Sequence, residues 1–129
     1  MNRKILLIED NEQNRYLVTF LLHARGWEVV HAGDGPTGID LATRISPAMV
    51  LLDIQLPGMD GYEVVRALRD IAALGDTPVV AVTSYAMPGD RERCMASGCT
   101  GYLEKPIDPL TFVDSVESFL SPLPAGAGL

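Results

Sequence analysis

The 129-residue sequence predicts an α/β fold in which a doubly wound parallel sheet of five strands carries helices on both faces. Two observations lead to this prediction. Short, uninterrupted apolar runs are typical of strands buried on both faces of a parallel sheet. Segments with apolar residues at helical spacing alternate with these runs along the whole chain. Strict alternation implies right-handed crossovers, which place helices on both sides of the sheet.

Composition and charge exclude several classes of partner. The chain is 47% hydrophobic and 21% charged, with a net charge of -7 and a pI near 4.6, which is ordinary for one globular domain. An acidic protein is poorly suited to nucleic acid or to an anionic membrane surface, but it is compatible with a cation site. Because no apolar run reaches the length of a membrane span and no signal-peptide pattern is present, we expect a cytoplasmic protein.

The first half of the chain contains three predicted strands, at residues 4–8, 28–32 and 49–52. The first helix is expected to begin after Asn11 as N-cap and to end at Gly26. Its apolar face is predicted to consist of Leu17, Phe20, Leu21 and Ala24. The second helix opens at residues 34–36, where a proline suits the first turn, and its apolar face is formed by Ile39, Ala42 and Ile45.

The second half begins with a turn at Pro57-Gly58 and continues with helices and strands in alternation. The third helix is marked by Val64, Leu68 and Ile71, and the fourth strand by residues 79–82. A short helix through Ala96 precedes a fifth strand at 101–104. The last helix is predicted to start at Asp108-Pro109 and to bury Leu110, Val113, Val116 and Leu120. We assign residues 1–121 to one domain and residues 122–129 to a flexible tail.

The two cysteines, Cys94 and Cys99, lie close together in a polar segment that contains glycine. A single pair is not a disulfide framework, and no cluster of cysteine and histidine accompanies it. We therefore expect two reduced thiols, at least one of them packed as a small residue, with a redox switch as the alternative.

Polar side chains follow the predicted strands at their carboxyl ends. The run at 49–52 leads directly into Asp53, and Glu9 and Asp10 follow the first strand. In the strand order 2-1-3-4-5, which is the flavodoxin-like order, ligands bind at the switch point between strands 1 and 3. The three acids are then expected to converge on one crevice, with Thr83 and Lys105 beside it.

Three neighbouring carboxylates repel one another, so this crevice requires positive charge. Mg²⁺ suits oxygen ligands, and Lys105 is a second source of charge. A metal and a lysine around a carboxylate nucleophile fit phosphoryl transfer, in which an aspartate forms an acyl phosphate. Simpler interpretations exist, because Asp53 can serve as a turn or cap residue and Glu9 and Asp10 as acids at a helix start.

An ordered set of motifs in this chain resembles the receiver domain of two-component response regulators. The resemblance covers residues 3–121. The matching pieces are Glu9-Asp10-Asn11, Leu52-Asp53, Leu56–Gly61, Thr83-Ser84, and Tyr102-Leu103 ahead of Lys105-Pro106.

For the phosphoacceptor and the metal, the resemblance implies specific roles. Asp53 is expected to accept a phosphoryl group from a histidine kinase or a histidine phosphotransfer protein. Mg²⁺ is expected to be coordinated by Asp10 and Asp53 and by the backbone carbonyl of Gln55. Glu9 is expected to act through water or as a further acidic group.

The resemblance also implies how the signal leaves the site. Lys105 and Thr83 are expected to contact the phosphoryl group, Tyr102 to change rotamer with it, and the bond from Lys105 to Pro106 to be cis. This coupling would switch a surface on the fourth helix, fifth strand and fifth helix that binds a downstream protein target. Positions 55 and 85 are expected to influence the lifetime of the phosphoryl group.

These roles describe a signalling phosphoacceptor and not an enzyme, and we expect it to act as a single-domain regulator. One alternative is a receiver cut from a hybrid histidine kinase or a larger regulator. Another is a phosphatase with an aspartyl-phosphate intermediate, but that class typically has an aspartate where this chain has Gln55. A flavin-binding module of the same strand order would need a phosphate-binding loop where Glu9 and Asp10 stand.

Overall fold

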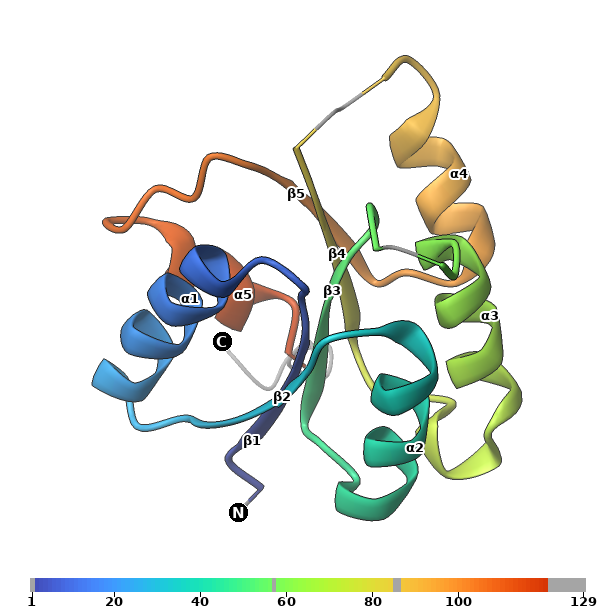
Figure 1. Cartoon of the computed structure of the whole chain (residues 1–129), viewed down its shortest axis with the longest axis horizontal. Coiled ribbons are helices and arrows are strands. Elements are labelled where there is room, and N and C mark those ends of the chain that lie inside the picture. Colours follow the sequence, from blue (N-terminus) through green and yellow to red (C-terminus); the bar gives the residue numbers. More distant parts are fainter. Residues whose placement is uncertain (1, 57, 85–86, 121–129) are drawn as a thin grey trace, which may run out of the picture.

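The chain folds around a parallel sheet with the strand order β2-β1-β3-β4-β5, as predicted (Figure 1). The computed structural model describes residues 2–56, 58–84 and 87–120. The predicted features at Pro57, at Tyr85 and in the tail 122–129 lie outside this part. The strands are β1 Lys4–Ile8, β2 Glu28–Ala32, β3 Met49–Asp53, β4 Val79–Thr83 and β5 Gly101–Glu104.

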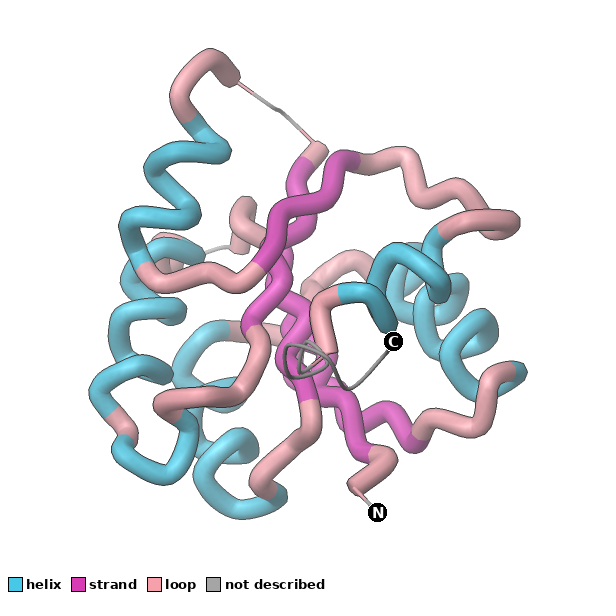
Figure 2. The backbone as a smooth tube through the Cα atoms, turned by 180° about the vertical axis from the view of Figure 1, so that it is seen from behind, coloured by secondary structure: helices cyan, strands magenta, loops and turns pink. Residues whose placement is uncertain are grey.

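Helices cover both faces of the sheet, as seen from the two opposite sides in Figures 1 and 2. The helices α1 and α5 lie on one face, and α2, α3 and α4 lie on the other. Within the described residues, no helix is long and apolar enough to cross a membrane. The bounds are α1 Glu12–Ala24, α2 Gly35–Ile45, α3 Gly61–Asp70, a 3₁₀ turn Ala72–Leu74, α4 Asp90–Ser97 and α5 Phe112–Ser118.

Alternating side chains of the strands form two separate hydrophobic cores. In β1, Leu6 and Ile8 face the core beneath α2, α3 and α4, whereas Ile5 and Leu7 face the core beneath α1 and α5. This division follows from the two-residue period of a strand. Because both faces are covered, β3 is buried along its whole length, and its last residue is Asp53.

Two helix starts predicted from the sequence are confirmed by side-chain caps. The side chain of Asn11 accepts a hydrogen bond from the Asn14 amide at 2.9 Å, and that of Asp34 accepts one from the Thr37 amide at 2.8 Å. Each cap satisfies an amide that has no partner within its helix. The Asn11 cap fixes the start of α1 immediately after Asp10.

The apolar face predicted for α1 is wrong in part. Phe20 is 58% exposed, and the buried residues of the helix are Val18 and Leu22. Both sets of residues have helical spacing, so the pattern alone does not say which one faces the sheet. The position of the helix against β1, β3 and α5 settles this in favour of Val18 and Leu22, which belong to the core shared with α5.

The start predicted for the last helix is also wrong. The side chain of Asp108 accepts a hydrogen bond from the Leu110 amide at 2.9 Å, which closes a separate turn, and α5 begins only at Phe112. Leu110, which we placed on the buried face, is 89% exposed. The cap-like pair Asp108-Pro109 therefore shapes the connection between β5 and α5.

The two cysteines form a disulfide, which contradicts the expectation of reduced thiols. Their Cα atoms are 5.6 Å apart, within the range that a disulfide requires. The cause is Gly98, whose φ of 114° turns the chain back after α4. The turn is closed by a hydrogen bond of 3.2 Å from the Cys99 amide to the Cys94 carbonyl.

Arg69, near the end of α3, fastens three segments together. Its Nε donates to the Gly98 carbonyl at 2.8 Å, and its guanidinium donates to the Thr77 carbonyl at 2.7 Å and to the Thr100 hydroxyl at 3.2 Å. The turn after α4 and the loop before β4 are thus held to α3 by one half-buried side chain.

We expect Arg69→Met to lower the free energy of unfolding by about 3 kcal/mol, because it leaves several carbonyls of these turns without a donor. Urea denaturation followed by the fluorescence of Trp27, the single and buried tryptophan, measures this effect. Arg66→Met is the matched control, since Arg66 is exposed on the same helix, and it should change stability by less than about 0.5 kcal/mol. Equal effects of the two substitutions would contradict this role of Arg69.

Candidate functional site

The predicted acidic residues meet at the carboxyl edge of the sheet. β1 and β3 are neighbours, and their register pairs Ile8 with Leu52, so Glu9 and Asp53 follow side by side. Carboxylate oxygens of Glu9, Asp10 and Asp53 all lie within 4.8 Å of one another. Glu9 and Asp53 are buried, whereas Asp10 is exposed to solvent. The cluster therefore has a buried floor and an open side.

Lys105 supplies a positive charge at the floor of this cluster. Its Nζ lies 3.0 Å from Glu9 Oε1 and 3.4 Å from Asp53 Oδ2, and the side chain is only 9% exposed. The Lys105 amide donates to the Thr83 carbonyl at 2.7 Å, which fixes the chain where β5 ends. The bond to Pro106 is cis, as the resemblance implied.

The acids outnumber the cations in the cluster. Three carboxylates and one ammonium group leave two negative charges when all are ionised, which is the charge of one divalent cation. Burial, together with the neighbouring Asp53, raises the pKa of Glu9 to about 7, and Lys105 opposes this rise. Oxygen donors with this charge deficit fit Mg²⁺.

The two oxygens of Asp53 have different surroundings. Oδ1 accepts a hydrogen bond of 2.9 Å from the Gln55 amide, and Oδ2 faces Lys105. The loop that supplies this amide is held close to α3, since a Cβ atom on Gly61 would lie 2.7 Å from the Ile54 Cα. The backbone thus fixes the carboxylate and leaves one oxygen directed at the ammonium group.

The side chain of Gln55 links the ends of β3 and β4. Its Nε2 donates to the Thr83 hydroxyl, and its Oε1 accepts a hydrogen bond of 3.0 Å from the Ser84 amide. The sequence predicted a role for the backbone carbonyl of Gln55 but not this side-chain contact. No local sequence pattern predicts the contact between Gln55 and Thr83, because it depends on the register between two strands that are separated by a helix.

Tyr102 lies in the core beside α4 and not among the acids. It is 7% exposed and pairs across the sheet with Ala81, two residues before Thr83. Burial raises the pKa of its hydroxyl group. Within the described residues this hydroxyl has no hydrogen-bond partner, and the Arg91 guanidinium lies 5.9 Å from the centre of the ring.

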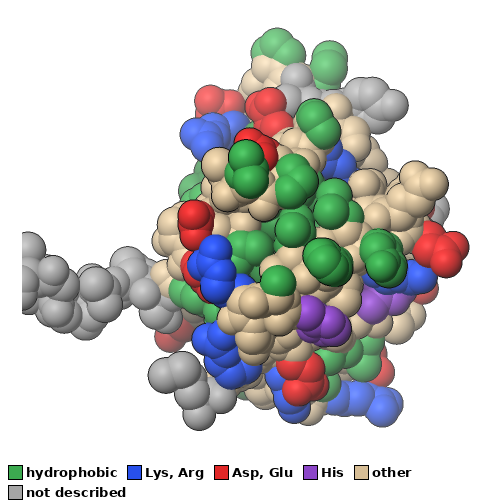
Figure 3. All heavy atoms as spheres, turned by 90° about the vertical axis from the view of Figure 1, so that its left-hand side faces the viewer, with side chains coloured by type: hydrophobic (Ala, Val, Ile, Leu, Met, Phe, Trp, Pro, Cys, Tyr) green, Lys and Arg blue, Asp and Glu red, His purple; other side chains and the backbone are tan. Residues whose placement is uncertain are grey.

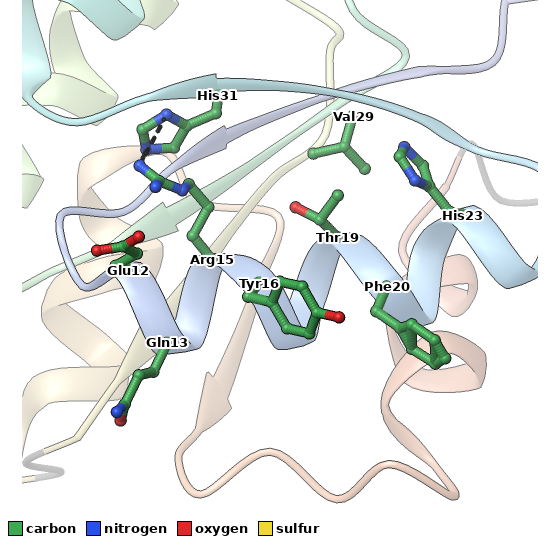
Figure 4. Close-up of a pocket in the computed structure, with 9 residues that line it drawn as sticks. All are labelled: Glu12, Gln13, Arg15, Tyr16, Thr19, Phe20, His23, Val29 and His31. Carbon is green, nitrogen blue, oxygen red and sulfur yellow. Dashed lines mark hydrogen bonds between the residues drawn. The ribbon is translucent and has the colours of Figure 1, made fainter.

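A groove of about 900 Å³ between α1 and β2 adjoins the cluster at the start of α1. Tyr16 and Phe20, which are 74% and 58% exposed, line it from the side of α1 (Figure 4). Figure 3 shows hydrophobic side chains gathered on the same side of the molecule, with charged and histidine side chains around them. This surface was not predicted from the sequence, because the helical spacing of Phe20 suggested a core position.

His31 joins the groove to the site. Its Nε2 lies 2.9 Å from the Glu9 carbonyl oxygen, which can only accept, so this nitrogen carries the hydrogen. The Arg15 guanidinium lies against the same ring, with Nη1 3.1 Å from Nε2 and 3.4 Å from Nδ1 (Figure 4). Residues of α1 and β2 thereby hold the backbone of Glu9 in place.

Known proteins resemble this chain over almost all of its length. Residues 5–117 match the response regulator receiver domain family. The polar-differentiation response regulator DivK of Brucella ovis is 40% identical over 120 residues, covering 93% of this chain and 98% of the relative.

Solved structures show the same likeness. The chemotaxis protein CheY4 of Vibrio cholerae has a TM-score of 0.88 and 29% identity, covering 93% of this chain and all of that one. The receiver domain of the sensor histidine kinase PA1611 of Pseudomonas aeruginosa was solved with a magnesium ion in its active-site cleft. It has a TM-score of 0.83 and 31% identity, covering 92% of this chain and 98% of that one.

Proposed function

Because this chain belongs to the response-regulator receiver family of two-component signalling, we propose that Asp53 accepts a phosphoryl group from a phosphohistidine. The donor is the histidine of a kinase or of a histidine phosphotransfer protein. The observation that carries the proposal is the buried carboxylate of Asp53, with one oxygen bound by a backbone amide and the other beside Lys105. Domains that work in this way are signalling components and not turnover enzymes.

In the proposed reaction, a carboxylate oxygen of Asp53 forms a bond to phosphorus while the phosphorus–nitrogen bond of the donor breaks. The donor imidazole leaves with the electron pair. Lys105 neutralises charge on the phosphoryl oxygens, and the Gln55 amide keeps the carboxylate oriented. Asp10, Asp53 and the Gln55 carbonyl would hold Mg²⁺, with Glu9 acting directly or through water, and the ion would supply further charge neutralisation.

We propose that Thr83 and Tyr102 carry the signal away from the site. Thr83 lies at the end of β4, and its hydroxyl is within reach of the loop after Asp53 through Gln55. The Tyr102 hydroxyl has no hydrogen-bond partner among the described residues that would hold its rotamer. A change at this ring alters the surface of α4, β5 and α5, where a downstream protein target binds.

We further propose that the protein acts as a single-domain regulator formed by residues 1–121. A response regulator of matching length supports this, since the chain covers 98% of the DivK relative. A receiver within a larger protein is the alternative, because the PA1611 receiver is part of a sensor histidine kinase. A donor charged from ATP works in the cytoplasm, and we expect this protein there too.

Intact mass after incubation with acetyl phosphate tests the chemistry. We expect the mass of one added phosphoryl group, and we expect it only when Mg²⁺ is present. A protein that takes up no phosphoryl group, and that binds no beryllofluoride in native mass spectrometry, would overturn the proposal.

The affinity for Mg²⁺ should depend on pH through Glu9. The pKa of Glu9 is about 7 in the folded protein, above its ordinary value of 4.5. Between these two pH values, Glu9 is protonated in the metal-free folded protein and ionised in the unfolded chain. Stability without metal therefore falls as pH rises between these two values. Because Mg²⁺ displaces that proton, its dissociation constant should fall about tenfold from about pH 6 to about pH 8.

Calorimetric titration with Mg²⁺ in buffers of different ionisation enthalpy measures both the affinity and the proton released. Glu9→Gln is the matched control, since the amide keeps the shape but carries no titrating proton, and its affinity should vary little over this range. An affinity of the natural protein that is flat with pH would contradict the role of Glu9.

We propose that the groove between α1 and β2 receives the helices that carry the donor histidine. We expect Phe20→Ala and Tyr16→Ala each to slow transfer from the cognate donor protein by about tenfold, because exposed aromatic side chains dominate such contacts. Both variants should accept phosphoryl groups from acetyl phosphate at the natural rate. Met95→Ala, which removes an exposed side chain on α4, is the control. Equal losses with both donors would place the defect in the chemistry and not in docking.

A further inference from the structure

The Cys94–Cys99 disulfide joins α4 to the segment that leads into β5. Cys94 is fully buried and Cys99 is 6% exposed, and both belong to the same hydrophobic core as Tyr102. The bond therefore lies inside the molecule, between the helix and the strand of the proposed output surface.

Apart from Cys94, α4 is held mainly by a side chain at the surface: the Arg93 guanidinium lies 3.4 Å from the Asp60 carboxylate and 4.2 Å from the centre of the Tyr62 ring. Of its eight residues, only Cys94 and Ser97 are buried, and the N-cap residue Gly89 offers no side chain to cap the helix. Cys94 is thus the one apolar side chain that anchors this helix in the core. A helix with so little buried surface lies at the low end of local stability.

The segment around Cys99, at the other end of the disulfide, is held by contacts that do not depend on the disulfide. Arg69 donates to the Gly98 carbonyl and to the Thr100 hydroxyl, and the Thr100 amide donates to the Val79 carbonyl at 2.7 Å. These contacts do not involve either sulfur atom. Loss of the disulfide therefore leaves the start of β5 fastened and releases mainly the last turn of α4.

We propose that the Cys94–Cys99 pair is a thiol–disulfide switch that sets how firmly α4 is attached to β5. Oxidation fixes the helix, and reduction loosens it. The effect on the output surface rests on the function proposed above, but the switch itself does not depend on Asp53.

The reaction needs a disulfide oxidant, and a small-molecule disulfide such as oxidised glutathione suffices. The Cys99 thiolate, the less buried of the two, attacks a sulfur of that molecule and expels one thiolate. The Cys94 thiolate then attacks Cys99 Sγ and expels the second. Two protein thiols and one external disulfide give one protein disulfide and two external thiols, which take up the two protons.

The test begins with the full chain equilibrated in buffers of graded reduced and oxidised glutathione. Alkylation with N-ethylmaleimide in denaturant, which makes the buried thiols accessible, followed by intact mass counts the free thiols. We expect two labels in reduced buffer and none in oxidised buffer. Two labels at every ratio would show that the pair does not form the bond and would overturn the proposal.

Hydrogen exchange of the peptide that covers α4 and β5 then measures attachment. We expect amides of α4 to exchange roughly tenfold faster in the reduced form, while α1 and α2 remain unchanged, because a short covalent loop restricts opening. Cys99→Ala, which keeps Cys94 in the core, should exchange like the reduced protein in every buffer. Identical exchange in the oxidised and reduced natural protein would overturn the switch.

Uptake of phosphate from acetyl phosphate, measured on the same samples, separates the two proposals. A redox-dependent α4 in a protein that takes up no phosphoryl group would sink the proposed function and leave the switch intact. A protein phosphorylated on Asp53 with redox-independent α4 would do the reverse.

Discussion

Asp53→Asn should take up no phosphoryl group from any donor, because an amide oxygen does not replace the carboxylate nucleophile. The variant should nevertheless fold, since the amide retains one oxygen for the hydrogen bond from the Gln55 amide. Removing one of three neighbouring carboxylates also relieves repulsion in the cluster. We therefore expect the metal-free variant to be more stable than the natural protein by about 1 kcal/mol at neutral pH.

Intact mass with acetyl phosphate and Mg²⁺, together with urea denaturation, measures both effects. Asp40→Asn is the matched control, because it makes the same chemical change at an exposed position on α2, and it should accept the phosphoryl group normally. A stable phosphoryl adduct on Asp53→Asn would sink the assignment of the acceptor.

Lys105→Ala should be the most destabilising change at the site. Lys105 is the one cation within hydrogen-bonding distance of Glu9 and Asp53 among the described residues, and all three side chains are buried. Its loss leaves buried carboxylates without a counter-charge, which should lower the free energy of unfolding by about 3 kcal/mol at neutral pH without metal. Millimolar Mg²⁺ should restore part of this loss, because it supplies the missing charge.

The same variant should respond weakly to phosphorylation, since the phosphoryl oxygens lose their lysine partner. Urea denaturation with and without Mg²⁺, and binding of the downstream target before and after phosphorylation, measure the two effects. Lys4→Ala is the control, because Lys4 is the only other lysine of the chain and begins β1 at the end opposite the cluster. An unchanged phosphorylation-dependent affinity in Lys105→Ala would contradict this role.

The sheet and the acidic cluster were predictable because both follow from local pattern and one topological rule. A short apolar run ending in an acid is visible in the sequence, and the strand order then brings Glu9, Asp10 and Asp53 together. The helix faces were less predictable. In α1, the helical spacing predicts a buried position for Phe20 as readily as for Leu22. Only the packing against the sheet and α5 places Leu22 in the core.

Contacts between distant segments were not predictable for the same reason. The link from Gln55 to Thr83 depends on the register of β3 and β4. The approach of Cys94 and Cys99 depends on the left-handed turn at Gly98, where the sequence shows only that a helix ends. Each is a consequence of tertiary geometry that neither composition nor periodicity records.

The acids of the cluster and the lysine that neutralises them lie far apart along the chain, so they are synthesised at different times. Lys105 lies 96 residues from Glu9 and 52 residues from Asp53, and it follows the strand at the edge of the sheet. A nascent chain produces its N-terminal segments first, so it carries the acids long before the lysine that neutralises them. Under the proposed function, a chain that has not yet paired β5 lacks Lys105 beside Asp53, and we expect such an incomplete chain to accept no phosphoryl group.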